Sequence, residues 1–350
     1  MSPRGRHSGH GAWTNRVPTT PIVGKVNALT SLALPRVDED MRRFEPLLAE
    51  SIIIGDPFLD QVTTHLISAG GKRLRPLLAI ASATGGEREA SQDDLLGGVA
   101  LELMHLASLY HDDVMDEATM RRNVESVNSR FGNLVAIVAG DFLMARSAAI
   151  AADLGTEIAG LLARTLALLT RGQVSEVRTA FDINRSVADY YEAIGGKTAA
   201  LMSSACRVGG LTARSDPGTL AALTAFGHEL GIVFQLRDDI LDITAVDGQL
   251  GKPAGQDLAE GIYTFPVLVA LKDPGVGDEL AALLGRALDE PEREKARSLV
   301  AGTEGIARSM DEARRHVELA AQAASTLSSR ALRDGFSLLA TGLLDGLDEL

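Results

Sequence analysis

The chain has little of what several common architectures require. Its 350 residues contain one cysteine, Cys206, so no internal disulfide can form, and a reducing compartment is expected. No proline occurs in residues 77–216, a length that strands joined by turns would struggle to match, so this stretch is predicted to be helical. Aromatic residues make up only 4% and the net charge is −13. Both values argue against a nucleic-acid-binding protein, which needs rings for base stacking or cations for phosphates.

Long apolar runs and a secretory leader are also missing. One of the longest runs, LVAIVAGDFLMA at 134–145, is interrupted by Asp141 and is shorter than the roughly 20 residues that cross a bilayer. No basic and then apolar segment with a cleavage site opens the chain. We therefore expect a cytoplasmic protein without a transmembrane segment.

The first 36 residues differ from the rest, because they carry five basic side chains and no acidic one. This composition predicts a disordered N-terminal extension, although an organelle-targeting peptide has a similar bias. From residue 37 onward, apolar residues recur every three or four positions and the breaks between them are short. With 45% apolar residues and no long polar linker, residues 37–350 are predicted to form one all-α domain of about a dozen helices.

Two aspartate motifs stand at the ends of apolar helical runs: DDVMD at 112–116 and DDILD at 238–242. On a helix, the first and last carboxylates of such a motif lie on one face, about 5.4 Å apart along the axis. Clustered carboxylates repel one another, and Mg²⁺ shared with substrate phosphates relieves that repulsion. A single motif is more often a helix cap or a solvated acidic face, but two copies after buried helices favour a metal site.

Basic residues accompany each aspartate motif. The segment GGKRLRP at 70–76 places three cations beside a glycine pair at a predicted helix start, and Arg121 and Arg122 follow the first motif. Backbone N–H groups at a helix start favour anions. Arginine offers two parallel hydrogen bonds to a phosphate and lysine a mobile charge, so the mixture suits a diphosphate.

In this order, the motifs resemble those of the trans-isoprenyl diphosphate synthases, also called polyprenyl synthetases. The resemblance covers nearly all of residues 38–350. It rests on GGKRLRP at 70–76, HLASLYHDDVMDEATMRR at 105–122, GKT at 196–198, FQLRDDILD at 234–242 and GKPAGQDL at 251–258. It implies an isoprenoid-synthase-type all-α helical bundle around a deep central cavity, commonly as a homodimer, with the two aspartate clusters facing each other across the mouth.

The resemblance also implies a role for each matching residue. Metal ligands would be Asp112, Asp116 and Asp238, holding about three Mg²⁺ ions, while Asp113, Asp239 and Asp242 complete the two catalytic motifs. Positions that hold or flank the allylic diphosphate are Arg121, Lys197, Thr198, Gln235 and Lys252. The pocket for isopentenyl diphosphate would consist of Lys72, Arg75, His105 and Arg122. Lys197, Thr198 and Gln235 would also stabilise the carbocation.

The implied reaction is ionisation, condensation and elimination. The allylic C–O bond breaks to give a carbocation, the double bond of isopentenyl diphosphate attacks it, and a proton is lost. One position departs from the family pattern, because Ile262 stands where members with short products often have a second lysine. Long-chain members frequently lack that lysine, so the departure indicates product length more than inactivity.

Small side chains below the first aspartate also bear on product length. Ala107 and Ser108 lie five and four residues before Asp112, one helical turn deeper, where an aromatic side chain would block the growing tail. We therefore predict geranylgeranyl diphosphate or a longer polyprenyl diphosphate as the product.

Three alternatives remain open. A class I terpene cyclase shares the all-α fold and one aspartate motif, but it has no need for the second motif or for GGKRLRP. A non-catalytic subunit of a heteromeric prenyl synthase is disfavoured by the intact aspartates. A purely structural helical protein would tolerate loss of Asp112 and Asp238.

Overall fold

The computed structural model describes residues 32–245 and 254–347. The first half contains α2 (Pro35–Glu50), α3 (Pro57–Ser68), α4 (Leu74–Thr84), α5 (Gln92–Met115), β1 (Met120–Arg121), β2 (Val124–Glu125), α6 (Val127–Phe131), α7 (Asn133–Leu154) and α8 (Thr156–Arg178). The second half contains α9 (Val187–Ile194), the π-helix η1 (Gly195–Ala199), α10 (Ala200–Thr212), α11 (Pro217–Thr244), α12 (Gln256–Ala259), α13 (Phe265–Ala270), α14 (Gly277–Leu283), α15 (Glu290–Ala301), α16 (Gly305–Ala324) and α17 (Arg330–Gly342). The all-α prediction is confirmed.

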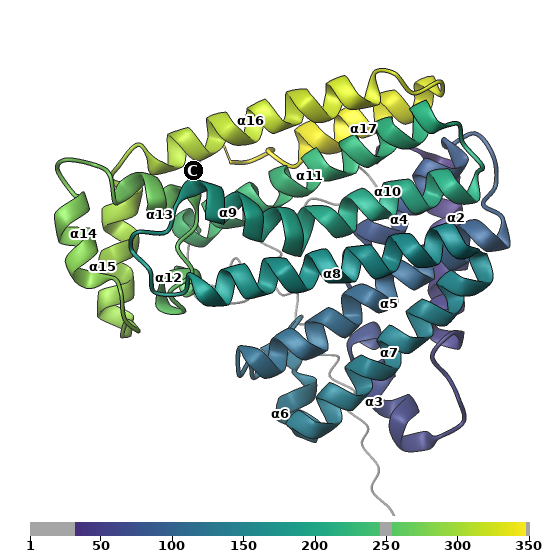
Figure 1. Cartoon of the computed structure of the whole chain (residues 1–350), viewed down its shortest axis with the longest axis horizontal. Helices are drawn as coiled ribbons and strands as arrows, with labels where there is room; N and C mark the ends of the chain where they lie inside the picture. The colour runs from purple at the N-terminus through teal and green to yellow at the C-terminus, as the bar shows by residue number, and fades with distance from the viewer. Residues whose placement is uncertain (1–31, 246–253, 348–350) are drawn as a thin grey trace, which may run out of the picture.

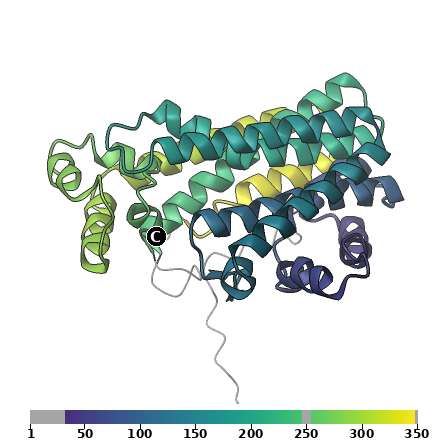
Figure 2. The ribbon, with the colours of Figure 1, turned by 60° about the horizontal axis from the view of Figure 1, so that its bottom comes forward.

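The long helices form a bundle. In Figure 1 they lie side by side, from α16 and α11 through α10 and α8 to α5 and α7, while α12 to α15 occupy one end. Turning the molecule brings α3 forward, below the bundle (Figure 2). The buried apolar side chains of α4, α5, α7, α10 and the first part of α11 belong to one core, whereas those near the end of α11 belong to two smaller clusters. Because α5 and α11 share this core, the two aspartate motifs that they carry are held in a fixed relation.

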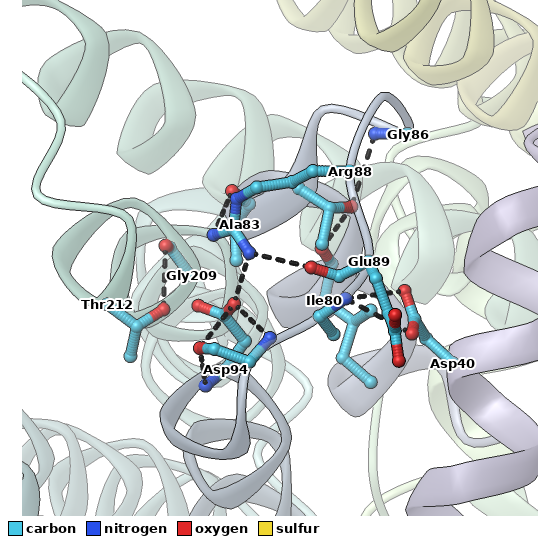
Figure 3. Close-up of polar contacts among 12 residues, drawn as sticks. Asp40, Ile80, Ala83, Gly86, Arg88, Glu89, Asp94, Gly209 and Thr212 are labelled. Carbon is cyan, nitrogen blue, oxygen red and sulfur yellow. Dashed lines mark hydrogen bonds and ion pairs between the residues drawn. The ribbon is translucent and has the colours of Figure 1, made fainter.

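The start of α5 is anchored by buried carboxylates (Figure 3). Asp94 accepts hydrogen bonds from the backbone N–H of Ser91 at 2.8 Å and from Arg88 Nη1 at 2.7 Å, and the two residues 91 and 94 form a capping box. Asp40 on α2 accepts from the backbone N–H of Ala90 at 3.1 Å. Each carboxylate is almost fully buried, so these bonds offset the cost of burial and fix the end of α5 opposite the first aspartate motif.

Two regions differ from the sequence prediction. Leu32 and Leu34 are buried in the core and α2 begins at Pro35, so residues 32–36 do not belong to a disordered extension. The segment after the first aspartate motif is a short antiparallel hairpin, β1 with β2, within a domain predicted to be all-α. Its turn residues, Arg122 and Asn123, have φ values of 54° and 63°, as a tight two-residue hairpin turn requires.

Two helices, α7 and α11, are long and apolar enough to cross a membrane by length and composition alone. Both are bundle helices here: α7 packs on α5, and α11 packs between α10 and α16. Core helices of globular proteins pass the same test, so this property does not by itself indicate a membrane span.

Candidate active site

The two aspartate motifs meet at one cavity. Asp112 and Asp116, at the end of α5, and Asp238, on α11, all line a cavity of about 730 Å³. A second cavity of about 670 Å³ adjoins it, because Asp116, Arg121, Lys197, Thr198 and Gln235 line both. The facing arrangement expected from the sequence is therefore present in the structure.

Nearby cations only partly offset the cost of burying the Asp112 and Asp116 carboxylates. Burial raises the pKa of Asp112 and of Asp116, and the Lys197 ammonium counteracts this only in part. The Asp112 carboxylate also raises the pKa of Asp116. The ionised forms would be stabilised by an additional cation between them.

Asp113 and Arg121 form an ion pair beside this cluster. Asp113 is fully buried, and its Oδ1 accepts from Arg121 Nε at 2.7 Å and lies 2.5 Å from Nη2. This pair fastens the hairpin to α5. The structure therefore places Asp113 behind the cavity as the anchor of Arg121 and leaves Arg121 on the cavity wall.

The second motif is connected to η1 by a chain of hydrogen bonds. Asp239 is buried and accepts from Tyr190 Oη at 2.6 Å and from Gln235 Nε2 at 2.9 Å. Gln235 Oε1 in turn accepts from Thr198 Oγ1 at 2.9 Å. Burial raises the pKa of Asp239 to about 8. Asp242 is also buried, and its Oδ2 accepts from the backbone N–H of Asp257 at 3.3 Å, so it holds the following segment rather than facing the cavity.

Lys197 lies on η1 and is paired with a residue that the sequence analysis missed. Its Nζ is 2.6 Å from Oε1 of Glu176 on α8, and this carboxylate, with Asp112, raises the pKa of Lys197 against the effect of burial. A π-helical turn is frequently found at functional sites. Here it aims Lys197 and Thr198 at both aspartate clusters.

Three residues of the predicted isopentenyl diphosphate pocket form the cation group: Arg75 and His105 line the first cavity, and Arg122 lines the second. Burial lowers the pKa of Arg75 to about 10, and burial together with Arg75 lowers the pKa of His105 well below its usual value, so His105 is neutral. Lys72 is exposed and its Nζ lies 5.4 Å from the ring centroid of Phe234 on α11. Arg122 donates to the carbonyl oxygens of Gly70 and Leu66 and thereby joins the hairpin to the GGKRLRP segment.

The donor set fits a divalent ion that is completed by substrate. Within residues 32–245 and 254–347, no group of three or more His, Cys, Asp or Glu side chains lies close enough to hold an ion by itself. Asp112, Asp116 and Asp238 nevertheless line one cavity, and burial raises the pKa of the first two. Carboxylates from two sides and bridging phosphates are the arrangement in which Mg²⁺ is usually bound.

The deep part of the first cavity is apolar. Its wall includes Leu109, Met144, Leu166, Leu169 and Leu201. Ser108 also lines it, whereas Ala107 is fully buried in the core and is not among the lining residues. Of the two residues predicted to set product length, the structure thus brings one to the cavity wall.

Two further predictions concern the segment after α11. Lys252 lies outside the described residues. Ile262 lines the second cavity, at the position where the resemblance led us to look for a lysine. Glu176 and Tyr190 were missed because no motif marks them and their partners are distant in sequence.

The comparisons with known proteins agree with this geometry. The polyprenyl synthetase family model matches residues 56–300. The chain belongs to the polyprenyl synthetase family. It is a trans-polyprenyl diphosphate synthase, as the sequence predicted. The nonaprenyl diphosphate synthase of Mycobacterium tuberculosis is 36% identical over 298 residues, which cover 85% of this chain and 89% of the relative.

Heptaprenyl diphosphate synthase component 2 of Geobacillus stearothermophilus is 38% identical over 252 residues, 72% of this chain and 78% of the relative. Among solved structures, a polyprenyl synthase from Caulobacter crescentus complexed with calcium and isoprenyl diphosphate has a TM-score of 0.84 and 31% identity, and the match covers 92% of this chain and 98% of that one. These matches confirm the predicted fold and enzyme class.

Proposed function

We propose that the protein condenses isopentenyl diphosphate with an allylic diphosphate, head to tail and in the trans configuration, to give geranylgeranyl diphosphate or a longer polyprenyl diphosphate. The observation that carries the proposal is one cavity lined by aspartates of both motifs, by the basic residues Arg75, Arg121 and Lys197, and by apolar side chains. Such a cavity matches a substrate with a diphosphate head and a hydrocarbon tail.

The aspartates would bind metal ions, and the basic residues would bind the two diphosphates. Asp112, Asp116 and Asp238 would hold Mg²⁺, about three ions, which when bound neutralises the leaving diphosphate and polarises the allylic C–O bond. Arg121 and Lys197 contribute fixed positive charge on the wall of the same cavity. Arg75, His105, Lys72 and Arg122 would hold the second diphosphate, that of the nucleophile.

The chain from Thr198 through Gln235 to Asp239 orients polar groups toward the reacting carbon. Gln235 uses its oxygen to accept from Thr198 and its nitrogen to donate to Asp239. The Thr198 hydroxyl and the Gln235 amide are thereby fixed before substrate enters, so their dipoles can stabilise a developing carbocation without reorganisation.

A product longer than farnesyl diphosphate is supported by the small Ser108 on the cavity wall and by Ile262 in the second cavity. Relatives named for nonaprenyl and heptaprenyl products point in the same direction. A class I terpene cyclase is disfavoured because the second aspartate cluster and the cation group are both present.

We also propose that the chain from Leu32 onward acts as one domain and that two copies associate through α7 and α8. Leu134, Val138 and Leu168 on these helices are large apolar side chains with exposed fractions of 75%, 53% and 44%. Ile137 and Val174 are also exposed and line the cavity, so a second copy would close its outer wall. A contiguous apolar face of this kind marks an association surface.

The proposed reaction is tested with the purified chain alone, Mg²⁺, labelled isopentenyl diphosphate and farnesyl diphosphate, with products separated by reversed-phase chromatography. We expect products of four or more isoprene units. In a parallel reaction primed with geranyl diphosphate, labelled farnesyl diphosphate as the end product would contradict the proposed length. No condensation, together with activity restored by a second subunit, would favour the non-catalytic or heteromeric alternative.

Association is tested by sedimentation with the Leu134→Glu/Val138→Glu double variant, since neither side chain lines the cavity. We expect the dimer to be lost. The control is Leu338→Glu on α17, whose exposed fraction of 52% is close to that of Val138, and it should leave the dimer intact. A monomeric native protein would refute the proposal.

A further inference from the structure

The GGKRLRP segment contains a buried arginine that the proposed function does not use. Arg73 immediately precedes α4, and its φ is 47°, a left-handed conformation that non-glycine residues adopt at a cost. Its side chain is 6% exposed, whereas the adjacent Lys72 is exposed. Burying a guanidinium is costly unless its N–H groups are hydrogen-bonded, so the partners of Arg73 indicate why it is buried.

Those partners come from three separate helices. Arg73 Nη1 donates to Oε1 of Glu102 on α5 at 2.8 Å, and Nε donates to Oε1 of Glu45 on α2 at 2.9 Å. Nη2 donates to the carbonyl oxygen of Ile67, near the end of α3, at 3.2 Å. Glu102 is only 2% exposed. The rigid fork of one arginine thus fixes the segment to α2, α3 and α5 at once.

The anchor lies directly behind the cation group. Glu102 is three residues before His105 on α5, so the two share a helix face. Arg75 follows Arg73 by two positions and lines the cavity. Glu102 also favours the charged forms of Arg75 and Arg122, because it raises the pKa of each.

We propose that Arg73 and Glu102 are positioning residues: their buried ion pair fixes Lys72 and Arg75 in the geometry that binds the diphosphate of isopentenyl diphosphate. This inference rests on the proposed function. A buried ion pair is seldom more stabilising than an apolar pair of similar volume, whereas its hydrogen bonds are directional. A role in orientation accounts for both the burial and the left-handed backbone at Arg73.

Steady-state kinetics of Arg73→Met test the inference. We expect the KM for isopentenyl diphosphate to rise by about tenfold or more, as a small misplacement of binding groups produces, while the KM for the allylic substrate changes by less than about twofold. A loss of folding alone would lower the active fraction and leave both KM values in place. Equal increases in both KM values, or none, would overturn the inference.

A double variant distinguishes the positioning role of Arg73 from simple neutralisation of the Glu102 charge. Arg73→Met leaves Glu102 buried without its arginine, so Arg73→Met/Glu102→Met is prepared as well, because it removes both charges and folds even if the single variant does not. We expect the raised KM for isopentenyl diphosphate to persist in the double variant. Recovery of the native KM would show that the pair only balances charge, and would overturn the inference.

Arg88→Met is the matched control. Arg88 also pairs with a buried carboxylate of α5, Asp94, but in the first turn of the helix (Figure 3). It should lower the melting temperature without raising either KM, and a selective rise in the KM for isopentenyl diphosphate would count against the inference.

Calorimetric titration with isopentenyl diphosphate separates this inference from the proposed function. A native chain that binds it but forms no product would refute the proposed function alone. Weaker binding by the double variant would still support the anchoring role, and equal binding would refute it.

Discussion

A single methyl group at Gly172 should displace the π-helix η1. Gly172 on α8 lies against η1, and a Cβ there would be 2.5 Å from the backbone nitrogen of Lys197 and 2.8 Å from the carbonyl oxygen of Ala193. Both neighbours are backbone atoms, which cannot turn aside as a side chain does. Ordinary contact distances begin near 3.5 Å, so Gly172→Ala should separate α8 from η1 by about 1 Å.

The expected magnitudes follow from that displacement. Alanine in place of a helix-interior glycine stabilises by about 0.5 to 1 kcal/mol, whereas overpacking costs about 1 to 3 kcal/mol. We expect Gly172→Ala to lower the free energy of unfolding by about 1 to 2 kcal/mol. Because Lys197 and Thr198 move with η1, a shift of about 1 Å should lower kcat/KM by about 100-fold.

Urea denaturation and product-formation kinetics measure the two effects, with Gly160→Ala as control. Gly160 is on the same helix, but its Cβ would meet only Arg164 Nη1, at 3.2 Å, the end of a flexible side chain. Gly160→Ala should retain full activity and gain up to about 1 kcal/mol. A fully active Gly172→Ala, or equal losses in both variants, would refute the reasoning.

Three other predictions concern the cavity. Ser108→Phe should shorten the product, because the ring would enter the apolar wall; an unchanged product profile on chromatography would contradict this. Arg121→Met removes the partner of the fully buried Asp113 and should lower the free energy of unfolding, measured by urea denaturation, by about 2 to 3 kcal/mol. The loss is smaller than for a fully buried pair because Arg121 is 31% exposed. Adding Asp113→Asn should recover most of the lost free energy. The folded-state pKa of Asp239 is about 8, above its value of 3.8 in the unfolded chain, so this carboxyl stabilises the fold most at low pH. The metal-free protein should therefore lose stability as the pH rises from about 4 to 8, and Asp239→Asn should flatten that melting-temperature profile.

The comparison of Asp112 with Asp113 shows how far a motif can be interpreted. Both were assigned to the catalytic cluster from the pattern alone. The structure places Asp112 on the cavity wall and Asp113 in a buried pair with Arg121. Adjacent helix positions point about 100° apart, so neighbours in a motif can face different surroundings.

Residues without a motif were not predictable. Glu176 meets Lys197 and Tyr190 meets Asp239 across 21 and 49 positions. Neither pairing follows from local periodicity, because it depends on how α8, α9 and α11 pack. Ala107 and Ser108 are adjacent small residues, yet only Ser108 lines the cavity, for the same reason of helix rotation.

The sequence by itself determined the helical class, the order of the motifs and the enzyme family, because helix periodicity and chemically necessary residue types are local properties. It also predicted that the two aspartate motifs lie at one site, and residues of both motifs line the same cavity. The tertiary structure decided which side of each helix faces the cavity, which apolar side chains line it, and that Arg73 is bonded to Glu102 while Arg75 lines the cavity. These features depend on the rotation and packing of helices distant in sequence, which local patterns do not encode.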